Sequence, residues 1–330
     1  MLEKPDLADE QILACLRDCF GIRAKSVAFL PIGNDATAWA YRVDAAKNEH
    51  YFLKIKKGTF YPASLTVPRY LHDHGLSQVV APLPGQDKQL WQPLREFRLI
   101  LYPFIEGRDG MSAGLTSAQW RDFGRALERI HATRLPAALA GQMRREDFRP
   151  PWEATVRELA KRIAHEQFRD PCKEALADFW QSRAAEIERI TARTEALGAA
   201  LRSAPPEFVL CHSDIHTANI LVEPGSDLAI IDWDYPQFAP AERDLMFVVG
   251  AGEPGQPASQ DEQCFFEGYG PAQVNQTALA YYRYEWVVQE IGDYGARVFL
   301  SSDGGEVTRQ ASVQGFRALF DAGDVIEAAY

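Results

Sequence analysis

The feature that most constrains this chain is a run of polar residues set between apolar segments, at residues 212–219. The run contains Asp214 and Asn219, and apolar stretches typical of short strands lie on both sides of it. Polar side chains in such a setting cost free energy unless they are hydrogen-bonded or used in chemistry. The fold must therefore hold this loop against a core, and the loop is the first candidate for a functional site.

A second polar turn follows closely along the chain. Asp232 and Asp234 come directly after the apolar run 228–231. Two strand-flanked turns this close in sequence can face one another across a hairpin, which would gather Asp214, Asn219 and Asp232 around one point. An Asp followed five positions later by an Asn has the spacing of a kinase catalytic loop, where a carboxylate orients the attacking hydroxyl and oxygen ligands hold Mg²⁺. The pattern favours phosphoryl transfer.

The remaining periodicity predicts an α+β protein in which a small antiparallel sheet precedes a set of helices. A helix is expected over residues 6–20, followed by strands at 27–32, 37–43, 51–55, 89–91 and 98–102. After Gly107 the apolar spacing becomes helical, with helices expected at 120–130, 152–164 and 176–201. We place the boundary between the two parts near residues 103–107.

Composition excludes several classes of protein. The 330 residues carry a formal net charge of −11, so the positive footprint that nucleic acid requires is missing. An acidic surface instead suits a small cationic ligand. No apolar stretch is long enough to cross a bilayer, and five cysteines give no disulfide framework. We expect a cytoplasmic protein with no nucleic-acid or membrane partner.

The two polar motifs resemble a known family. His212-Ser-Asp-Ile-His-Thr-Ala-Asn219 and Ile-Ile-Asp232-Trp-Asp234 resemble the aminoglycoside phosphotransferase family, whose members are relatives of choline kinases with a protein-kinase-like fold. Further segments resemble its spectinomycin phosphotransferase branch, at residues 51–54, 102–105, 211–216, 242–247, 266–270 and 281–283. The resemblance implies a two-lobed fold, with a nucleotide-binding lobe at 1–104 and a mostly helical lobe at 105–330 that carries the catalytic loop, metal site and substrate pocket.

The resemblance also implies roles for individual residues. Asp214 would be the catalytic base, braced by His212, while Asn219 and Asp232 would hold Mg²⁺. Lys54 would pair with the α- and β-phosphates of ATP or GTP. A turn over the phosphates is implied for Gly33, Asn34 and Asp35. A segment beside the adenine is implied for Tyr102, Phe104 and Ile105.

The implied acceptor is a small cationic amino-sugar or aminocyclitol, with spectinomycin as the first candidate, and the implied role is antibiotic resistance. The implied assembly is a monomer or homodimer. Acidic side chains of the helical lobe would meet its positive charge, and the candidates are Asp234, Glu242, Asp244, Glu285, Glu290 and Asp293. For Asp244 an ion pair with the adjacent Arg243 is an alternative.

The sequence departs from the kinase pattern at the partner of Lys54. Kinases position this lysine with a glutamate on the following helix, but no Asp or Glu lies between Lys54 and His72. Pro68 falls where that helix should run and predicts a helix that is kinked or begins late, near Pro68. Asp73 is the nearest carboxylate, so the residue that positions Lys54 stays open.

Other functions compete with this interpretation. A kinase of the same fold could act on choline, homoserine or a sugar, or the chain could be a nucleotide-binding module with weak catalysis. Histidines at 72, 74, 212 and 216 could in principle bind a hydrolase metal. Ser213 lacks the Gly-x-Ser-x-Gly context of a nucleophile.

Overall fold

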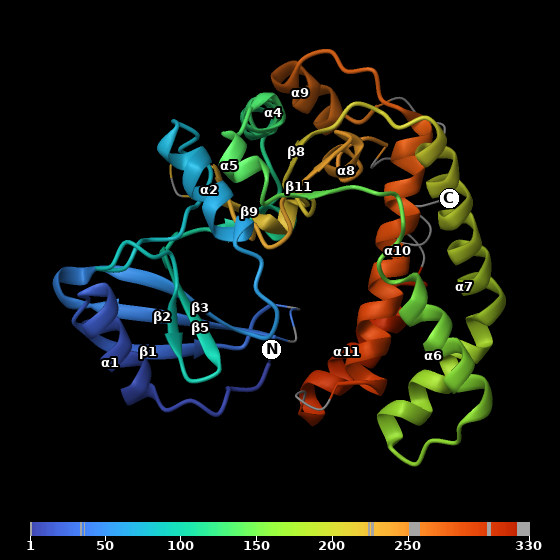
Figure 1. Cartoon of the computed structure of the whole chain (residues 1–330), viewed down its shortest axis with the longest axis horizontal. Helices are drawn as coiled ribbons and strands as arrows, with labels where there is room; N and C mark the ends of the chain where they lie inside the picture. The colour runs from blue at the N-terminus through green and yellow to red at the C-terminus, as the bar shows by residue number, and fades with distance from the viewer. Residues whose placement is uncertain are drawn as a thin grey trace. The chain divides into compact units, whose positions relative to one another are not determined.

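The computed structural model describes residues 2–33, 35, 37–223, 225, 228–250, 258–301 and 305–321. Contacts group the chain into two units, one formed by residues 1–145 with 208–273 and the other by 146–207 with 274–330 (Figure 1). The sheet and both polar turns belong to the first unit. The α+β class expected from the sequence is confirmed, while the lobe boundary near residue 104 stays a prediction.

The first unit begins with a helix packed on a five-stranded antiparallel sheet of order β1-β2-β3-β5-β4. These elements are α1 (Asp9–Phe20), β1 (Ala24–Leu30), β2 (Ala38–Ala45), the short helix η1 (Ala46–Asn48), β3 (His50–Lys57), β4 (Gln92–Leu94) and β5 (Phe97–Pro103). The buried side chains of α1 cover the sheet face that carries Leu53 and Ile55. Because side chains alternate along a strand, Lys54 and Lys56 project from the opposite face.

Helix α2 (Ala63–Asp73) corrects one expectation. It begins at Ala63, ahead of Pro68, so the prediction of a start near Pro68 is wrong. A proline at this position removes one backbone hydrogen bond, and the helix buries Leu65, Val67 and Leu71 on the same segment. Packing of this apolar face offsets the lost bond.

Two small sheets carry the polar turns. The first has the order β10-β9-β6 and the second β7-β11-β8. Their strands are β6 (Arg108–Asp109), β7 (Arg144–Arg145), β8 (Val209–Cys211), β9 (Ile220–Val222), β10 (Leu228–Ile230) and β11 (Gln237–Ala239). Strand β10 is tied to the segment after α2, because Val80 N donates to Ile230 O at 3.0 Å and Ile230 N donates to Gln78 O at 2.7 Å. The turn that holds Asp232 is thereby fixed beside the end of α2.

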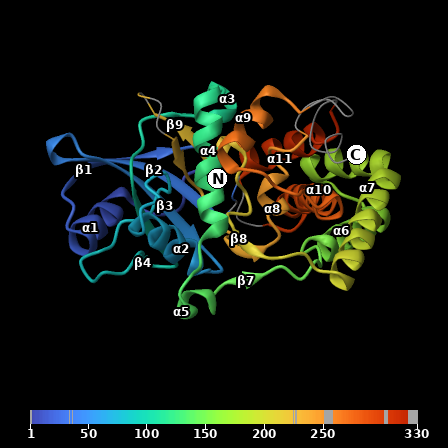
Figure 2. The same ribbon diagram turned by 90° about the horizontal axis from the view of Figure 1, so that it is seen from above.

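The first unit contains further helices, and one of them, η2, is part of the first polar turn. They are α3 (Gly110–Ala113), α4 (Ser117–Ala132), α5 (Ala137–Ala140), η2 (Thr217–Asn219), α8 (Glu242–Leu245) and α9 (Gln260–Tyr269). A capping box of Thr116 and Gln119 starts α4. Helices α4 and α9 approach closely (Figure 2). The approach depends on Gly124 and Gly268, because a side chain at either position would clash with the backbone of the facing helix. The end of α9 lies against the first half of α4, and from there the Tyr269 hydroxyl reaches His131 in the last turn of α4.

The second unit is helical. It contains α6 (Glu153–His165), α7 (Pro171–Ser203), α10 (Gln276–Phe299) and α11 (Glu306–Ala318), and α10 packs against the other three (Figure 1). Trp180 of α7 stacks on Phe316 of α11 with ring centroids 5.3 Å apart. The helices expected at 152–164 and 176–201 are confirmed with small shifts. Within the described ranges, none of the helices combines the length and apolar character needed to cross a membrane.

Candidate active site

The hairpin of β9 and β10 brings the two polar turns together. Ile220 lies opposite Ile230 in its antiparallel register, and beyond this pair Ile231 N donates to Asn219 O at 3.0 Å. Asn219 precedes the first strand and Asp232 follows the second. Both side chains therefore start from the same end of the hairpin, as the spacing of the apolar runs suggests.

Asn219 is bonded to Asp214 within the loop. Its Nδ2 donates to Asp214 O at 2.8 Å and to Asp214 Oδ2 at 3.2 Å. Burial raises the pKa of the Asp214 carboxyl above its ordinary value, and the Asp232 charge adds to this while His216 and His212 oppose it. A carboxylate with a raised pKa is a stronger proton acceptor, which suits a general base that takes a proton from a hydroxyl.

His212 braces the same loop. Asp214 N donates to its Nδ1 at 3.2 Å, so Nε2 carries the proton and donates to Ile231 O at 2.9 Å. The imidazole thus links the loop to the segment that leads into Asp232. With both ring nitrogens engaged, His212 is not available as a metal ligand.

The histidines at 72 and 74, and the Asp73 between them, make bonds to nearby residues. His72 Nδ1 bonds to Val79 O at 2.8 Å, and His74 Nδ1 bonds to Tyr70 O at 2.7 Å. Asp73 forms an ion pair with Arg69. These contacts bind each side chain to its own neighbourhood, and they give no support to a hydrolase metal site.

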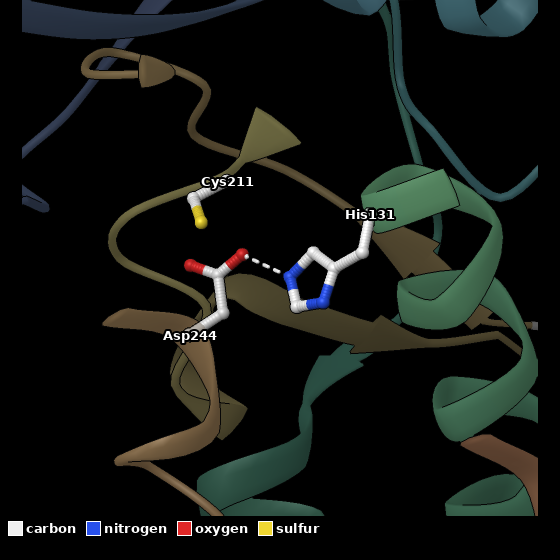
Figure 3. Close-up of side chains that lie close together, drawn as sticks. All are labelled: His131, Cys211 and Asp244. Atoms are coloured by element: carbon white, nitrogen blue, oxygen red, sulfur yellow. Dashed lines mark hydrogen bonds and ion pairs between the residues drawn. The ribbon is translucent and has the colours of Figure 1, made fainter. Parts of the chain in front are cut away.

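A buried carboxylate supports the loop from behind. Asp244 is 0% exposed; its Oδ2 accepts from His212 N at 2.9 Å and its Oδ1 from Ser213 N at 2.7 Å. His131 Nε2 lies 3.0 Å from Oδ2 (Figure 3), and His131 Nδ1 lies 2.7 Å from the Tyr269 hydroxyl. Asp244 therefore binds the main chain of the loop at Ser213, whose φ of 77° is unusual for a residue other than glycine.

Cys211 lies beside this pair (Figure 3). Ligand atoms of His131, Cys211 and Asp244 are all within 4.8 Å of one another, the spacing of a metal centre. The Cys211 thiol, however, donates to Ala239 O at 3.6 Å and Pro240 O at 3.5 Å, and burial raises its pKa well above the ordinary value. A metal binds the thiolate, and both Asp244 oxygens are already hydrogen-bonded, so we interpret the cluster as a structural anchor.

Lysines from the sheet meet the second polar turn. Lys54 Nζ donates to Asp232 Oδ1 at 2.7 Å and to Asp234 Oδ2 at 2.9 Å. Lys56 Nζ donates to the same Asp234 oxygen at 2.7 Å. Asp232 has a φ of 62°, so both polar turns contain a non-glycine residue in the left-handed region, a strain that clusters at functional sites.

The charges in this group stabilise one another. Burial alone would raise the pKa of Asp234, but the Lys54 and Lys56 ammonium groups hold it well below its usual range. Burial would likewise lower the pKa of Lys54, and Asp232 with Asp234 raises it well above the ordinary value. Lys54 therefore carries its positive charge at neutral pH, as a phosphate-binding lysine must.

The turn after β1 is tied to this group. Asp35 Oδ2 lies 3.1 Å from Lys56 Nζ, and Asp35 Oδ1 accepts from Thr37 N and Thr37 Oγ1, each at 2.7 Å. Gly33 has a φ of 85°, a conformation that favours glycine. Asn34, expected in the same turn, lies outside the described residues.

The donor atoms of the two turns fit a divalent metal. Asn219 uses its amide nitrogen on Asp214, so its amide oxygen is the atom available to a cation. Asp232 adds a carboxylate that is 42% exposed. Carbonyl-type and carboxylate oxygens are what Mg²⁺ and Ca²⁺ prefer. The residues present therefore fit the expected magnesium site.

The segment expected beside the adenine, residues 102–105, begins at the end of β5 and continues beyond the sheet. Tyr102 shares a sheet face with Lys54, its ring is 6.4 Å from that of Phe52, and burial raises the pKa of its phenol. Phe104 N donates to His50 O at 3.3 Å. Ile105 follows in a half-buried position.

The acidic residues expected at the substrate are divided between the two units. Asp234 binds the two lysines, and Glu242 and Asp244 are buried in α8. Asp244 in particular serves the catalytic loop instead of facing a ligand. The others are on α10 of the second unit, where Glu285 is buried and Glu290 and Asp293 are half-buried.

Sequence reasoning missed two residues of this site. Lys56 could have been found from its two-residue spacing after Lys54, which places both on one sheet face. His131 belongs to the buried face of α4, and nothing in its sequence spacing distinguishes it from the core residues of that face.

A strand lysine bonded to an Asp, at the end of a hairpin that also holds an Asp-Asn loop, is the arrangement that defines the class of kinases that transfer phosphoryl groups to hydroxyls. Comparison with known proteins agrees. Residues 28–279 match the sequence profile of the phosphotransferase enzyme family, so the chain belongs to this family. The protein is a phosphotransferase with an alcohol group as acceptor.

Individual relatives sharpen the comparison. The chain is 34% identical to spectinomycin phosphotransferase APH(9)-Ia, solved in complex with ADP and spectinomycin; the match has a TM-score of 0.86 and covers 98% of each chain. It is 27% identical to Protein StrN of Streptomyces griseus over 82% of this chain and 78% of that protein. An amicoumacin kinase solved with AMP-PNP and Ca²⁺ shares the fold, with a TM-score of 0.62, 16% identity, and coverage of 95% and 93%.

Proposed function

We propose that this protein transfers the γ-phosphoryl group of ATP to a hydroxyl of an aminocyclitol antibiotic, with spectinomycin as the first candidate. The observation that carries the proposal is the arrangement of Asp214, Asn219, Asp232 and Lys54 within one unit. The 34% identity to a phosphotransferase solved with spectinomycin supports this choice of acceptor.

Each residue has a part in the proposed reaction. Asp214 accepts the proton of the acceptor hydroxyl as the hydroxyl oxygen attacks the γ-phosphorus, and the bond from that phosphorus to the β–γ bridging oxygen breaks to release ADP. Asn219 and Asp232 would hold Mg²⁺, which neutralises charge on the phosphates. Lys54 leaves Asp232 and shares its charge with the α- and β-phosphates. His212 and Asp244 keep the loop that carries Asp214 in place.

The nucleotide contacts belong to the same proposal. The turn of Gly33 and Asp35 covers the phosphates, and the main chain from Tyr102 to Ile105 faces the adenine.

A panel of acceptors tests the proposal. Purified protein with Mg²⁺ and ATP is offered spectinomycin, a second aminocyclitol, choline, homoserine and a hexose, and release of ADP is followed; GTP replaces ATP in a parallel series. We expect ADP release with spectinomycin well above the rate without acceptor. The Asp214→Asn variant should lose this release, while Asp122→Asn, an exposed acid of α4, should keep it.

Two results would oppose the proposal. ADP release with choline or homoserine alone would move the protein to a metabolic kinase of the same fold. Binding of Mg·ATP without turnover of any acceptor would favour a nucleotide-binding module.

A further inference from the structure

The lysine that contacts the phosphates lacks the partner that kinases supply from the next helix. In α2 (Ala63–Asp73), Asp73 is the single acidic residue, and it occupies the last position of the helix. Its carboxylate is paired with Arg69, four residues earlier. Helix α2 therefore offers Lys54 no carboxylate, although such a lysine requires one to hold its ammonium toward the phosphates.

The buried carboxylate that contacts Lys54 belongs instead to Asp234, in the turn after β10. One of its oxygens, Oδ2, accepts from Lys54 Nζ at 2.9 Å and from Lys56 Nζ at 2.7 Å. The Asp234 side chain is 16% exposed and that of Lys54 is 14% exposed, so the pair is largely shielded from water. Lys56 is further fixed by Asp35, at 3.1 Å. Lys54 and Lys56 thus hold the Asp234 carboxylate together.

Asp232 also contacts Lys54, at 2.7 Å, but it is a weaker candidate for a permanent partner. Its side chain is 42% exposed, and under the proposed function it binds a divalent cation. Two cations then compete for one carboxylate. When the metal binds Asp232, the contact that remains to Lys54 is the one from Asp234.

We propose that Asp234 is the residue that positions Lys54, in place of the helix glutamate of other kinases, with Lys56 holding the Asp234 carboxylate. This inference rests on the proposed function, because it takes Lys54 as the ligand of the nucleotide phosphates. It also reassigns Asp234, which the sequence placed among the substrate-binding acids. Asp234 acts through Lys54 and does not touch the acceptor.

The test compares Asp234→Asn and Asp234→Glu with the wild type, and Asp73→Asn is the control because it removes the one acid of α2. For each protein the affinity for AMP-PNP with Mg²⁺ is measured by calorimetry, and the KM for ATP, the KM for spectinomycin and the half-saturating Mg²⁺ concentration are measured by ADP release. Circular dichroism and thermal unfolding establish that each variant is folded.

Loss of a charge-assisted bond to Lys54 should lower kcat/KM for ATP and weaken AMP-PNP binding by about 10-fold to 100-fold in Asp234→Asn. The KM for spectinomycin and the Mg²⁺ requirement should stay within about 2-fold of wild type, because under this inference Asp234 contacts neither the acceptor nor the metal. Asp234→Glu should recover part of the nucleotide affinity, and Asp73→Asn should match the wild type.

Three outcomes would overturn the inference. A raised KM for spectinomycin with normal AMP-PNP affinity would return Asp234 to the substrate. A raised Mg²⁺ requirement would make it a metal ligand. Unchanged kinetics and affinity in Asp234→Asn would remove the role altogether. Calorimetry with AMP-PNP needs no acceptor, so a wild type that binds nucleotide but phosphorylates nothing contradicts the proposed function and still leaves the effect of Asp234 measurable.

Discussion

Replacing Asp244 by asparagine should loosen the catalytic loop from behind. The carboxylate is 0% exposed and accepts three bonds, from His212 N, Ser213 N and His131 Nε2. An asparagine keeps one acceptor oxygen. With that oxygen in the place of Oδ2, the buried Ser213 N–H loses its partner, while His212 N and His131 Nε2 keep a neutral, weaker acceptor. The first effect costs about 1–3 kcal/mol and the second about 1 kcal/mol, which gives about 2–4 kcal/mol for the loop.

Hydrogen–deuterium exchange measures this loss where it occurs. Because about 1.4 kcal/mol is a factor of ten, the amides of His212 and Ser213 should exchange roughly 30-fold to several-hundred-fold faster in Asp244→Asn. Peptides covering residues 209–220 report the change, and Asp122→Asn, an exposed acid of α4, is the matched control. Unchanged exchange at the two amides would refute the reasoning.

The effect has a defined pH dependence. Burial alone would raise the pKa of Asp244, but the His131 hydrogen bond, the neighbouring histidines and the Ser213 N–H lower it below its ordinary value. A group with a lowered folded-state pKa contributes stability above its unfolded pKa, about 3.9, and loses it as pH falls through the folded value. The difference in exchange between wild type and Asp244→Asn should therefore be equal at pH 6 and pH 8 and shrink below about pH 4.

Three further outcomes follow from the site. Asp232→Asn should raise the Mg²⁺ concentration for half-maximal activity by about 10-fold or more, because it removes a charged metal ligand; activity against Mg²⁺ concentration checks this. Lys54→Met should raise the KM for ATP and leave the KM for the acceptor unchanged in steady-state kinetics. Cys211 should resist iodoacetamide at pH 8 in the folded protein, because burial raises the pKa of its thiol, while the half-buried Cys172 reacts first; peptide mass spectrometry distinguishes the two.

Local patterns account for what the sequence predicted well. The apolar runs around residues 212–219 and 228–231 are short and bounded by polar turns, and their pairing as β9 and β10 depends on neighbours in the chain. The Asp214–Asn219 bond lies within five residues. Four strands of the five-stranded sheet and the long helix α7 likewise follow from side-chain periodicity, whereas the strand expected at 89–91 is wrong and the fourth strand of the chain, β4, lies at Gln92–Leu94.

Contacts between distant segments account for what the sequence could not predict. His131 and Asp244 are 113 residues apart, and Lys56 and Asp234 are 178 apart, so no local spacing indicates that either pair meets. An acidic residue such as Asp244 is expected at the surface. It is buried because its carboxylate is bound by amides of the loop. At α2, the proline signal was outweighed by packing of an apolar face that extends to both sides of Pro68.

The proposed reaction, in which Asp214 activates a spectinomycin hydroxyl for attack on ATP, leaves a phosphorylated product. Mass spectrometry of spectinomycin after incubation with the protein, Mg²⁺ and ATP detects that product. We expect one added phosphoryl group with the wild type and none above background with Asp214→Asn, although that variant still binds AMP-PNP. Unmodified spectinomycin after incubation with the wild type, or equal amounts of product from both proteins, would contradict the proposed reaction.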